Sequence, residues 1–284
     1  SILIVKEIMG IVVMARKASE KSRIKPDGKD KDGNYHEYGD ELSSLIEEYL
    51  ETERNFRNKC VTFIEVLKKV QEKFSEDPQK VAYLGDIIDI YSKIIPITED
   101  TIKMIDPALS VEEQLEALKS GYSADYAQRY FDTLSPSILR CDEFLAWFAH
   151  LEKSDKEKIT VVLKDMKVPD TMRSFLTIST QRGPRHELFF KEMNKKTADY
   201  KVGHKGYLGF LIENVQRNIR LVNEEGIIRQ YAQSKGISIE EVKADKSHLD
   251  IISAREERKA LDEKVNEMGG LVTGKKLFRR TQIQ

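Results

Sequence analysis

The sequence predicts an all-α fold, an elongated bundle of long helices. Apolar residues recur every three or four positions over most of the chain, the spacing that places them on one helical face. Of the 284 residues, 33% are charged, whereas glycine (15) and proline (7) are sparse, as is typical of long solvent-facing helices. No stretch shows the strict apolar–polar alternation that indicates a strand.

The longest predicted helix covers residues 42–74. Its apolar positions are Leu42, Leu45, Tyr49, Phe56, Cys60, Phe63, Leu67, Val70 and Phe74. Residues 22–41 are polar and glycine-rich without an apolar period, so we expect a linker there. A second helix is expected over residues 81–105, with a kink at Pro96 because proline lacks the N–H that an internal turn uses.

Further helix starts are marked by serine followed three residues later by glutamate, the capping box. The pattern occurs at Ser110 with Glu113, Ser154 with Glu157, and Ser238 with Glu241. Between the first two of these starts we expect two helices that separate near Pro136. The remaining expected helices cover residues 155–167, 171–200, 206–233 and 238–268.

The expected helix at 171–200 contains a Gly183-Pro184 step. An internal proline costs about 3 kcal/mol or more, and glycine adds about 1 kcal/mol relative to alanine. Long polar side chains surround the step, and Leu188 and Phe189 follow at helical spacing. We expect a break here that turns Arg185 outward while Leu188 and Phe189 re-enter the core.

These features divide the chain into an N-terminal arm and linker (1–39), a helical domain (40–235), and a C-terminal helical extension with a basic tail (236–284). The last helix has a thin apolar stripe, so it is the expected docking or dimer helix of a monomer or weak dimer. The stripe comprises Leu249, Ile252, Leu261, Val265 and Met268. Two interpretations of the tail stay open, weak contact with an anionic membrane or a solvated end. Its cations are Lys275, Lys276, Arg279 and Arg280.

Composition and motifs argue against several classes of function. The net charge of −1 argues against a dedicated nucleic-acid binder. Cys60 and Cys141 lie in apolar helical patterns, as expected for buried thiols in a reducing compartment. The stretch 269–276 lacks the serine or threonine of a phosphate-binding loop, and the stretch 28–39 lacks the end carboxylates of a calcium loop. We expect neither a metal site nor a cofactor.

Residues 175–197, FLTISTQRGPRHELFFKEMNKKT, resemble the third conserved region of Dbl-homology domains, the helical exchange factors for Rho-family GTPases. The positions in register are Leu176, Gln181, Arg182, Pro184, Arg185, Leu188, Lys191 and Glu192. Residues 44–56 are similar to the first region, with a glutamate before a Thr-Glu pair and an aromatic residue. Residues 83–91 and 220–225 resemble the family's second and last long helices, so the resemblance covers residues 40–233.

The chain also departs from the family pattern. Ile178-Ser179 replaces the usual Lys-Pro, and His186 replaces a tyrosine. The residues after 233 are predicted to be helical, where the family carries a pleckstrin-homology domain. The chain therefore resembles a divergent member without that domain, of a kind expected among secreted pathogen effectors. A cytoplasmic location is expected, in the host cytosol for such an effector.

The resemblance implies guanine-nucleotide exchange without covalent chemistry and preference for a nucleotide-free Rho-family GTPase. It implies that Glu48 holds the first switch, and that Arg185 and Asn223 bind the second switch beside Gln181. Thr177 falls where the family discriminates among partners. The remaining expected contact residues are Arg182, His186 and Glu224, with His186 a rim or packing residue.

Two other functions stay open at this point. The first is a catalytically silent Dbl-like scaffold that binds a GTPase or another protein, which the Ile178-Ser179 replacement keeps in view. The second is a coiled-coil adaptor without a GTPase partner, which self-association of the long helices would favour.

Overall fold

The computed structural model describes residues 36–200, 206 and 208–258, and their regular secondary structure is entirely helical. This confirms the predicted all-α class for the described part of the chain. The helices are α2 (His36–Lys73), α3 (Pro78–Lys103), α4 (Val111–Gly121), α5 (Ala124–Leu139), α6 (Cys141–His150), α7 (Lys153–Asp165), α8 (Met172–Thr177), the 3₁₀ turn η1 (Ser179–Gln181), α9 (Arg182–Tyr200), α10 (Gly209–Lys235) and α11 (Ile239–Ala244).

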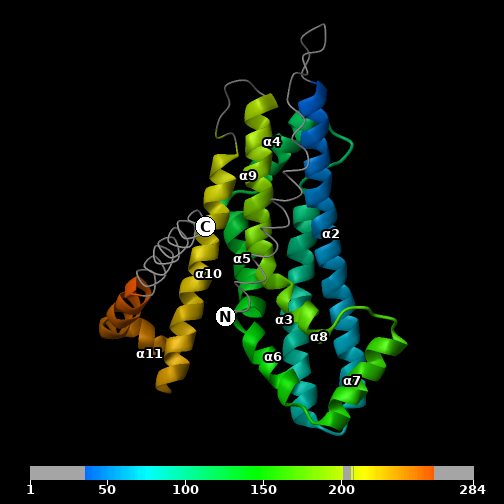
Figure 1. Ribbon diagram of the computed structural model, residues 1–284, viewed down its shortest axis with the longest axis vertical. Coiled ribbons are helices and arrows are strands. Elements are labelled where there is room, and N and C mark those ends of the chain that lie inside the picture. The colour runs from blue at the N-terminus through cyan, green and yellow to red at the C-terminus, as the bar shows by residue number, and fades with distance from the viewer. Residues whose placement is uncertain (1–35, 201–205, 207, 259–284) are drawn as a thin grey trace, which may run out of the picture. The chain divides into compact units, whose positions relative to one another are not determined.

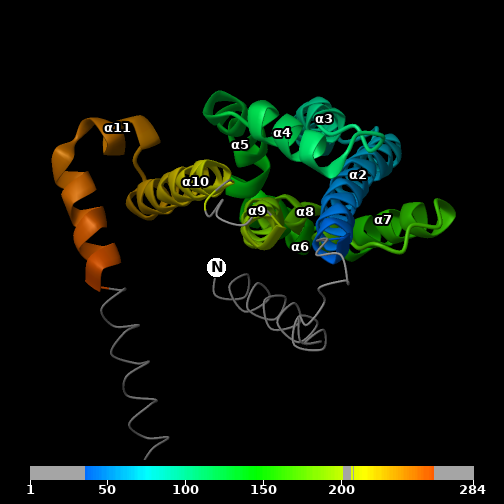
Figure 2. The ribbon, with the colours of Figure 1, turned by 90° about the horizontal axis from the view of Figure 1, so that it is seen from above.

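The chain forms two compact units that divide between Arg220 and Leu221, within α10. In the first unit, α2 packs along α3 and α9 and also contacts α7, while α5 packs on α3 (Figures 1 and 2). The expected apolar stripe of α2 is buried along its length, apart from the half-buried Leu45. Each fully buried large side chain contributes about 1.5–3 kcal/mol, so this stripe organises the first unit.

The capping boxes at Ser110 and Ser238 are confirmed, and each serine accepts a hydrogen bond from the backbone N–H of its glutamate. The box predicted at Ser154 is wrong. Helix α7 begins two residues earlier than predicted, at Lys153, and its N-cap residue Glu152 makes no side-chain capping bond. Ser154 therefore lies inside the first turn, where it cannot serve as the cap.

The break predicted near Pro136 is also misplaced, because α5 continues through this proline to Leu139 and the chain turns at Arg140. Proline leaves the carbonyl group one turn earlier without its usual backbone donor. That carbonyl belongs to Asp132, and it accepts a hydrogen bond from the Ser135 hydroxyl instead (3.2 Å). Because this bond satisfies the Asp132 carbonyl, α5 can continue through Pro136.

The Gly183-Pro184 step lies in the first turn of α9 and not in the middle of a helix. The chain passes from α8 through η1 into α9, so the interruption precedes the step. Proline is tolerated in a first turn because its missing N–H has no intrahelical acceptor there. Leu188 is exposed, against expectation, and Phe190 and Met193 are buried in the core.

The glycine at position 183 is explained by close packing between helices. A Cβ atom at this position would lie 2.8 Å from Ile219 Cγ1 on α10 and 3.1 Å from Phe131 Cε1 on α5. Both distances are shorter than carbon–carbon van der Waals contact. Glycine therefore lets α9 approach the two neighbouring helices closely.

In the second unit, α11 and a helical segment over residues 246–258 follow the end of α10. The single helix expected at 238–268 is interrupted at Asp245, whose extended backbone ends α11 and whose side chain accepts a hydrogen bond from Ser247 N–H (2.8 Å). Leu249 and Ile252 pack on a cluster of Tyr231, Ala232 and Val242. Helix α2 begins at His36, so it includes the last four residues of the predicted arm and linker at 1–39. Residues 1–35, the positions Leu261, Val265 and Met268, and the basic tail lie outside the described residues.

Candidate functional site

The two stretches at 44–56 and 175–197 meet in the structure through a buried ionic network between α2 and α9. Glu53 and His186 are fully buried, and Arg182 is 2% exposed. The Arg182 guanidinium forms an ion pair with Glu53 Oε1, and His186 Nε2 lies 2.7 Å from the same oxygen. His186 and Glu53 are 133 positions apart along the chain.

Aromatic side chains enclose this network. The Tyr130 hydroxyl donates to Glu53 Oε2 (3.4 Å), and the Tyr122 hydroxyl lies 2.9 Å from His186 Nδ1. The Arg182 guanidinium lies over the Phe56 ring, 4.6 Å from its centroid, as in a cation–π contact. The charged groups are thus both paired and hydrogen-bonded, as buried charges must be.

The contacts define the protonation states. Burial lowers the pKa of Arg182 to about 9, so the guanidinium remains charged at pH 7. Burial and the positive charge of Arg182 lower the pKa of His186 well below its ordinary value of 6.5. The neutral imidazole then donates its Nε2 hydrogen to Glu53 and accepts the Tyr122 hydrogen at Nδ1.

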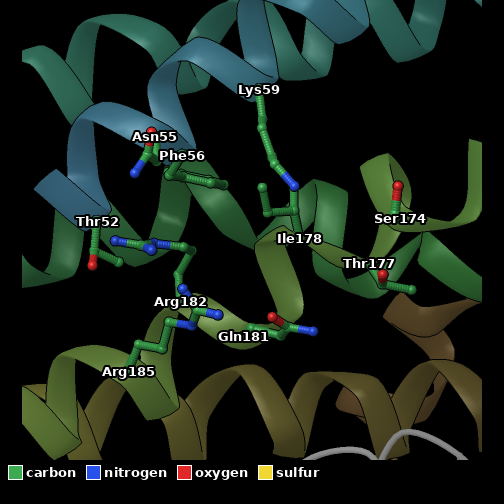
Figure 3. A pocket seen from close by; sticks show the side chains of 10 residues that line it. All are labelled: Thr52, Asn55, Phe56, Lys59, Ser174, Thr177, Ile178, Gln181, Arg182 and Arg185. Carbon is green, nitrogen blue, oxygen red and sulfur yellow. The ribbon is translucent and has the colours of Figure 1, made fainter. Parts of the chain in front are cut away.

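An open pocket of about 240 Å³ lies beside this network, between α2 on one side and α8, η1 and α9 on the other (Figure 3). Its lining residues are Thr52, Asn55, Phe56, Lys59, Ser174, Thr177, Ile178, Gln181, Arg182 and Arg185. Arg185 and Gln181 both lie at its edge on the side of α9 and η1, and Lys59 extends into it from α2 (Figure 3).

The structure brings several predicted site residues together here. Gln181, Thr177 and Arg185 line the pocket and are partly exposed. Glu48 is exposed on α2 one helical turn before Thr52, and residues four apart lie on the same helical face. The side chain of Glu48 forms neither an ion pair nor a hydrogen bond with any residue in the described part of the chain.

Glu187 is the carboxylate nearest to Arg185 in the sequence of α9, two residues later. Glu187 accepts hydrogen bonds from Lys191 (2.5 Å) and Gln216 (2.8 Å). Within the described ranges the side chain of Arg185 has neither an ion pair nor a hydrogen bond. Its guanidinium is therefore available to a ligand in the pocket.

Arg182 and His186 are placed differently from the expectation that they contact a partner. Their burial leaves almost no surface for a partner to touch, because Glu53 and the tyrosines enclose them. Their position joins α9 to α2 and fixes the floor of the pocket. For His186, this is the packing role that the sequence analysis allowed.

Asn223 and Glu224 are exposed on α10 in the second unit. They are not among the residues that the structure brings together at the pocket. Each remains a prediction from the resemblance.

Sequence reasoning missed Glu53, Asn55 and Lys59. Glu53 had a usable signal, since it lies four residues after Tyr49 and three before Phe56, on the apolar stripe of α2. A carboxylate at a core position requires a buried cation. Nothing local marks Asn55 or Lys59, which resemble ordinary exposed helix residues.

No model of a known protein family matches the chain, and no curated protein matches it. Among the described residues, no group of three or more histidine, cysteine, aspartate or glutamate side chains is arranged to hold a metal ion. None of the described helices combines the length and the apolar character needed to cross a bilayer.

Proposed function

We propose that this chain accelerates guanine-nucleotide exchange on a Rho-family small GTPase. One observation carries the proposal. The two stretches that resemble the family's first and third regions face each other across one pocket, joined by the Glu53–Arg182 pair. Two stretches that bind one partner must lie on one surface, and this arrangement meets that requirement.

The proposed mechanism is differential binding. An exchange factor that binds the nucleotide-free GTPase more tightly than the loaded form must weaken nucleotide binding by the same factor. Glu48, exposed and unpaired among the described residues, would compete for the first switch and its magnesium contacts. Arg185, with Asn223 and Gln181, would bind the second switch.

The architecture suits this task because the polar side chains project from packed helices. Phe56, Arg182 and the buried tyrosines hold the backbone beneath Arg185 and Gln181. A backbone that is held in place before binding loses less conformational entropy on binding than a flexible one. A cytosolic location and a monomer or weak dimer belong to the same proposal.

The test is the release of a fluorescent GDP analogue from a panel of Rho-family GTPases. We expect acceleration on at least one member and a loss of tenfold or more with Glu48→Ala, Arg185→Ala or Asn223→Ala. Glu47→Ala is the matched control, since this glutamate is also exposed on α2 but points about 100° away around the helix. Equal rates for Glu47→Ala and Glu48→Ala would contradict the role of Glu48.

A second candidate is a silent scaffold that binds the GTPase without exchanging its nucleotide. The observation in its favour is Ile178, an apolar residue that lines the pocket where the family usually has lysine. Ser179 beside it is fully buried, and its hydroxyl has no hydrogen-bond partner among the described residues. Binding of a nucleotide-free GTPase without faster GDP release would support this candidate.

A further inference from the structure

We propose that the pocket between α2 and α8–η1–α9 receives a carboxylate side chain of the partner GTPase, with Lys59 and Arg185 as its cationic walls. The inference rests on the proposed function and adds Lys59 to its binding residues. It names a chemical group, an aspartate or glutamate, that the partner must present at this position.

The charged residues that line the pocket favour an anionic group as its ligand. Three of the described lining residues are cationic, namely Lys59, Arg182 and Arg185, and none of them is acidic. Arg182 is paired with Glu53 and Lys59 with Asp170, so the uncompensated positive charge at the pocket is that of Arg185. Most of the other lining side chains are hydroxyls and amides, so the pocket presents hydrogen-bond donors around a positive centre.

Unused donors carry the second step. The Arg185 guanidinium lines the pocket, is partly exposed and has neither an ion pair nor a side-chain hydrogen bond among the described residues. Arg182 is 2% exposed and is already paired with Glu53, so it belongs to the floor of the pocket and not to the surface that a partner meets. The free donors of Arg185 are therefore the ones that an acceptor group of the partner can use.

Lys59 can take part although it already has one partner. Its ammonium lies 3.2 Å from Asp170 Oδ1, and its side chain is 45% exposed. An ammonium group carries three donors, so two remain for a ligand. Asp170 also accepts a hydrogen bond from the Ser174 hydroxyl (3.1 Å), which shares its charge between two donors.

The size of the pocket favours a protein side chain over a small molecule. Its volume of about 240 Å³ lies below the roughly 300–1,000 Å³ of pockets that bury drug-sized ligands. Glu48 is exposed one helical turn before Thr52, which lines the pocket, so a partner that binds Glu48 would lie close to the pocket. One carboxylate side chain fits this volume, and its two oxygens can accept charge-assisted hydrogen bonds from cationic donors.

The test is a charge swap with a GTPase that the exchange assay selects. Each acidic residue of its switch loops is changed to lysine, and the affinity of the nucleotide-free form is measured for wild type, Lys59→Glu and Lys68→Glu. Lys68 is the matched control, an exposed lysine on α2 outside the pocket. Lys59→Gln checks the loss of charge alone, and circular dichroism checks that each variant is folded.

We expect Lys59→Glu to weaken binding at least tenfold, Lys59→Gln to weaken it less, and Lys68→Glu to leave it unchanged. One lysine substitution in the GTPase should weaken wild-type binding and restore binding to Lys59→Glu. If exchange proceeds but Lys59→Glu binds like Lys68→Glu, or no acidic residue shows this compensation, the carboxylate site is wrong and the proposed function stands. If wild type binds no GTPase, both are wrong.

Discussion

At the scale of single residues, Glu53 is the group on which the contact between α2 and α9 depends. Glu53→Ala would leave the Arg182 guanidinium buried without a counter-charge, and breaking a buried ion pair in this way costs about 3–5 kcal/mol. We expect that loss in the free energy of unfolding from urea titration. The exposed Glu65→Ala, also on α2, is the control, and equal effects of the two substitutions would contradict this role of Glu53.

His186 predicts how stability depends on pH. Its pKa is lower in the folded protein than the ordinary 6.5, so below about pH 6.5 the unfolded chain binds a proton that the folded chain does not. Stability from this group is therefore complete above that pH and falls as the pH decreases, by up to about 1.4 kcal/mol per pH unit. The groups that face it are Glu53, Arg182, Tyr122 and Tyr130.

The measurement is urea unfolding at pH 7.5, 6 and 5 for wild type, His186→Asn and His150→Asn. His186→Asn should show a shallower decline of stability between pH 7.5 and 5 than wild type, whatever its stability at neutral pH. The control variant His150→Asn, at an exposed position, should lose stability between pH 7.5 and 5 as wild type does. If stability falls between pH 7.5 and 5 as steeply in His186→Asn as in wild type, groups other than His186 cause the pH dependence.

At the scale of elements, the close approach of α9 to α5 and α10 depends on Gly183. Gly183→Ala places a Cβ 2.8 Å from Ile219 Cγ1, and overpacking of this kind costs typically about 1–3 kcal/mol. Gly209→Ala at the start of α10 is the control, since a Cβ there has open space. Thermal unfolding should show a lower Tm for the first variant and an equal or higher Tm for the second.

The sequence predicted helices well and their ends less well. The stripe of α2 is periodic, so its burial followed from spacing alone. The turn at Arg140 could not be predicted in the same way, because a proline usually indicates a break. The hydrogen bond from the Ser135 hydroxyl to Asp132 O reduces the cost of Pro136 inside α5. The start of α9 was likewise hidden, since nothing in the local pattern separates an internal Gly-Pro step from one in a first turn.

At the scale of the whole molecule, the expected contact residues include some that lie at the pocket and others that lie buried beneath it, and the sequence does not distinguish the two groups. Arg185, Gln181 and Thr177 were expected at a binding surface, and the structure places them at one pocket. The burial of Arg182 could not be predicted from its own neighbours in sequence. It is buried because Glu53, more than a hundred residues earlier, supplies the counter-charge.

The most direct test of the central claim compares the affinity of this chain for one Rho-family GTPase with and without bound GDP. If the chain is an exchange factor, it must bind the nucleotide-free form at least tenfold more tightly, and excess GTP with magnesium must dissociate the complex. Equal affinity for the two forms would contradict the account, because a ligand that binds two states equally shifts neither.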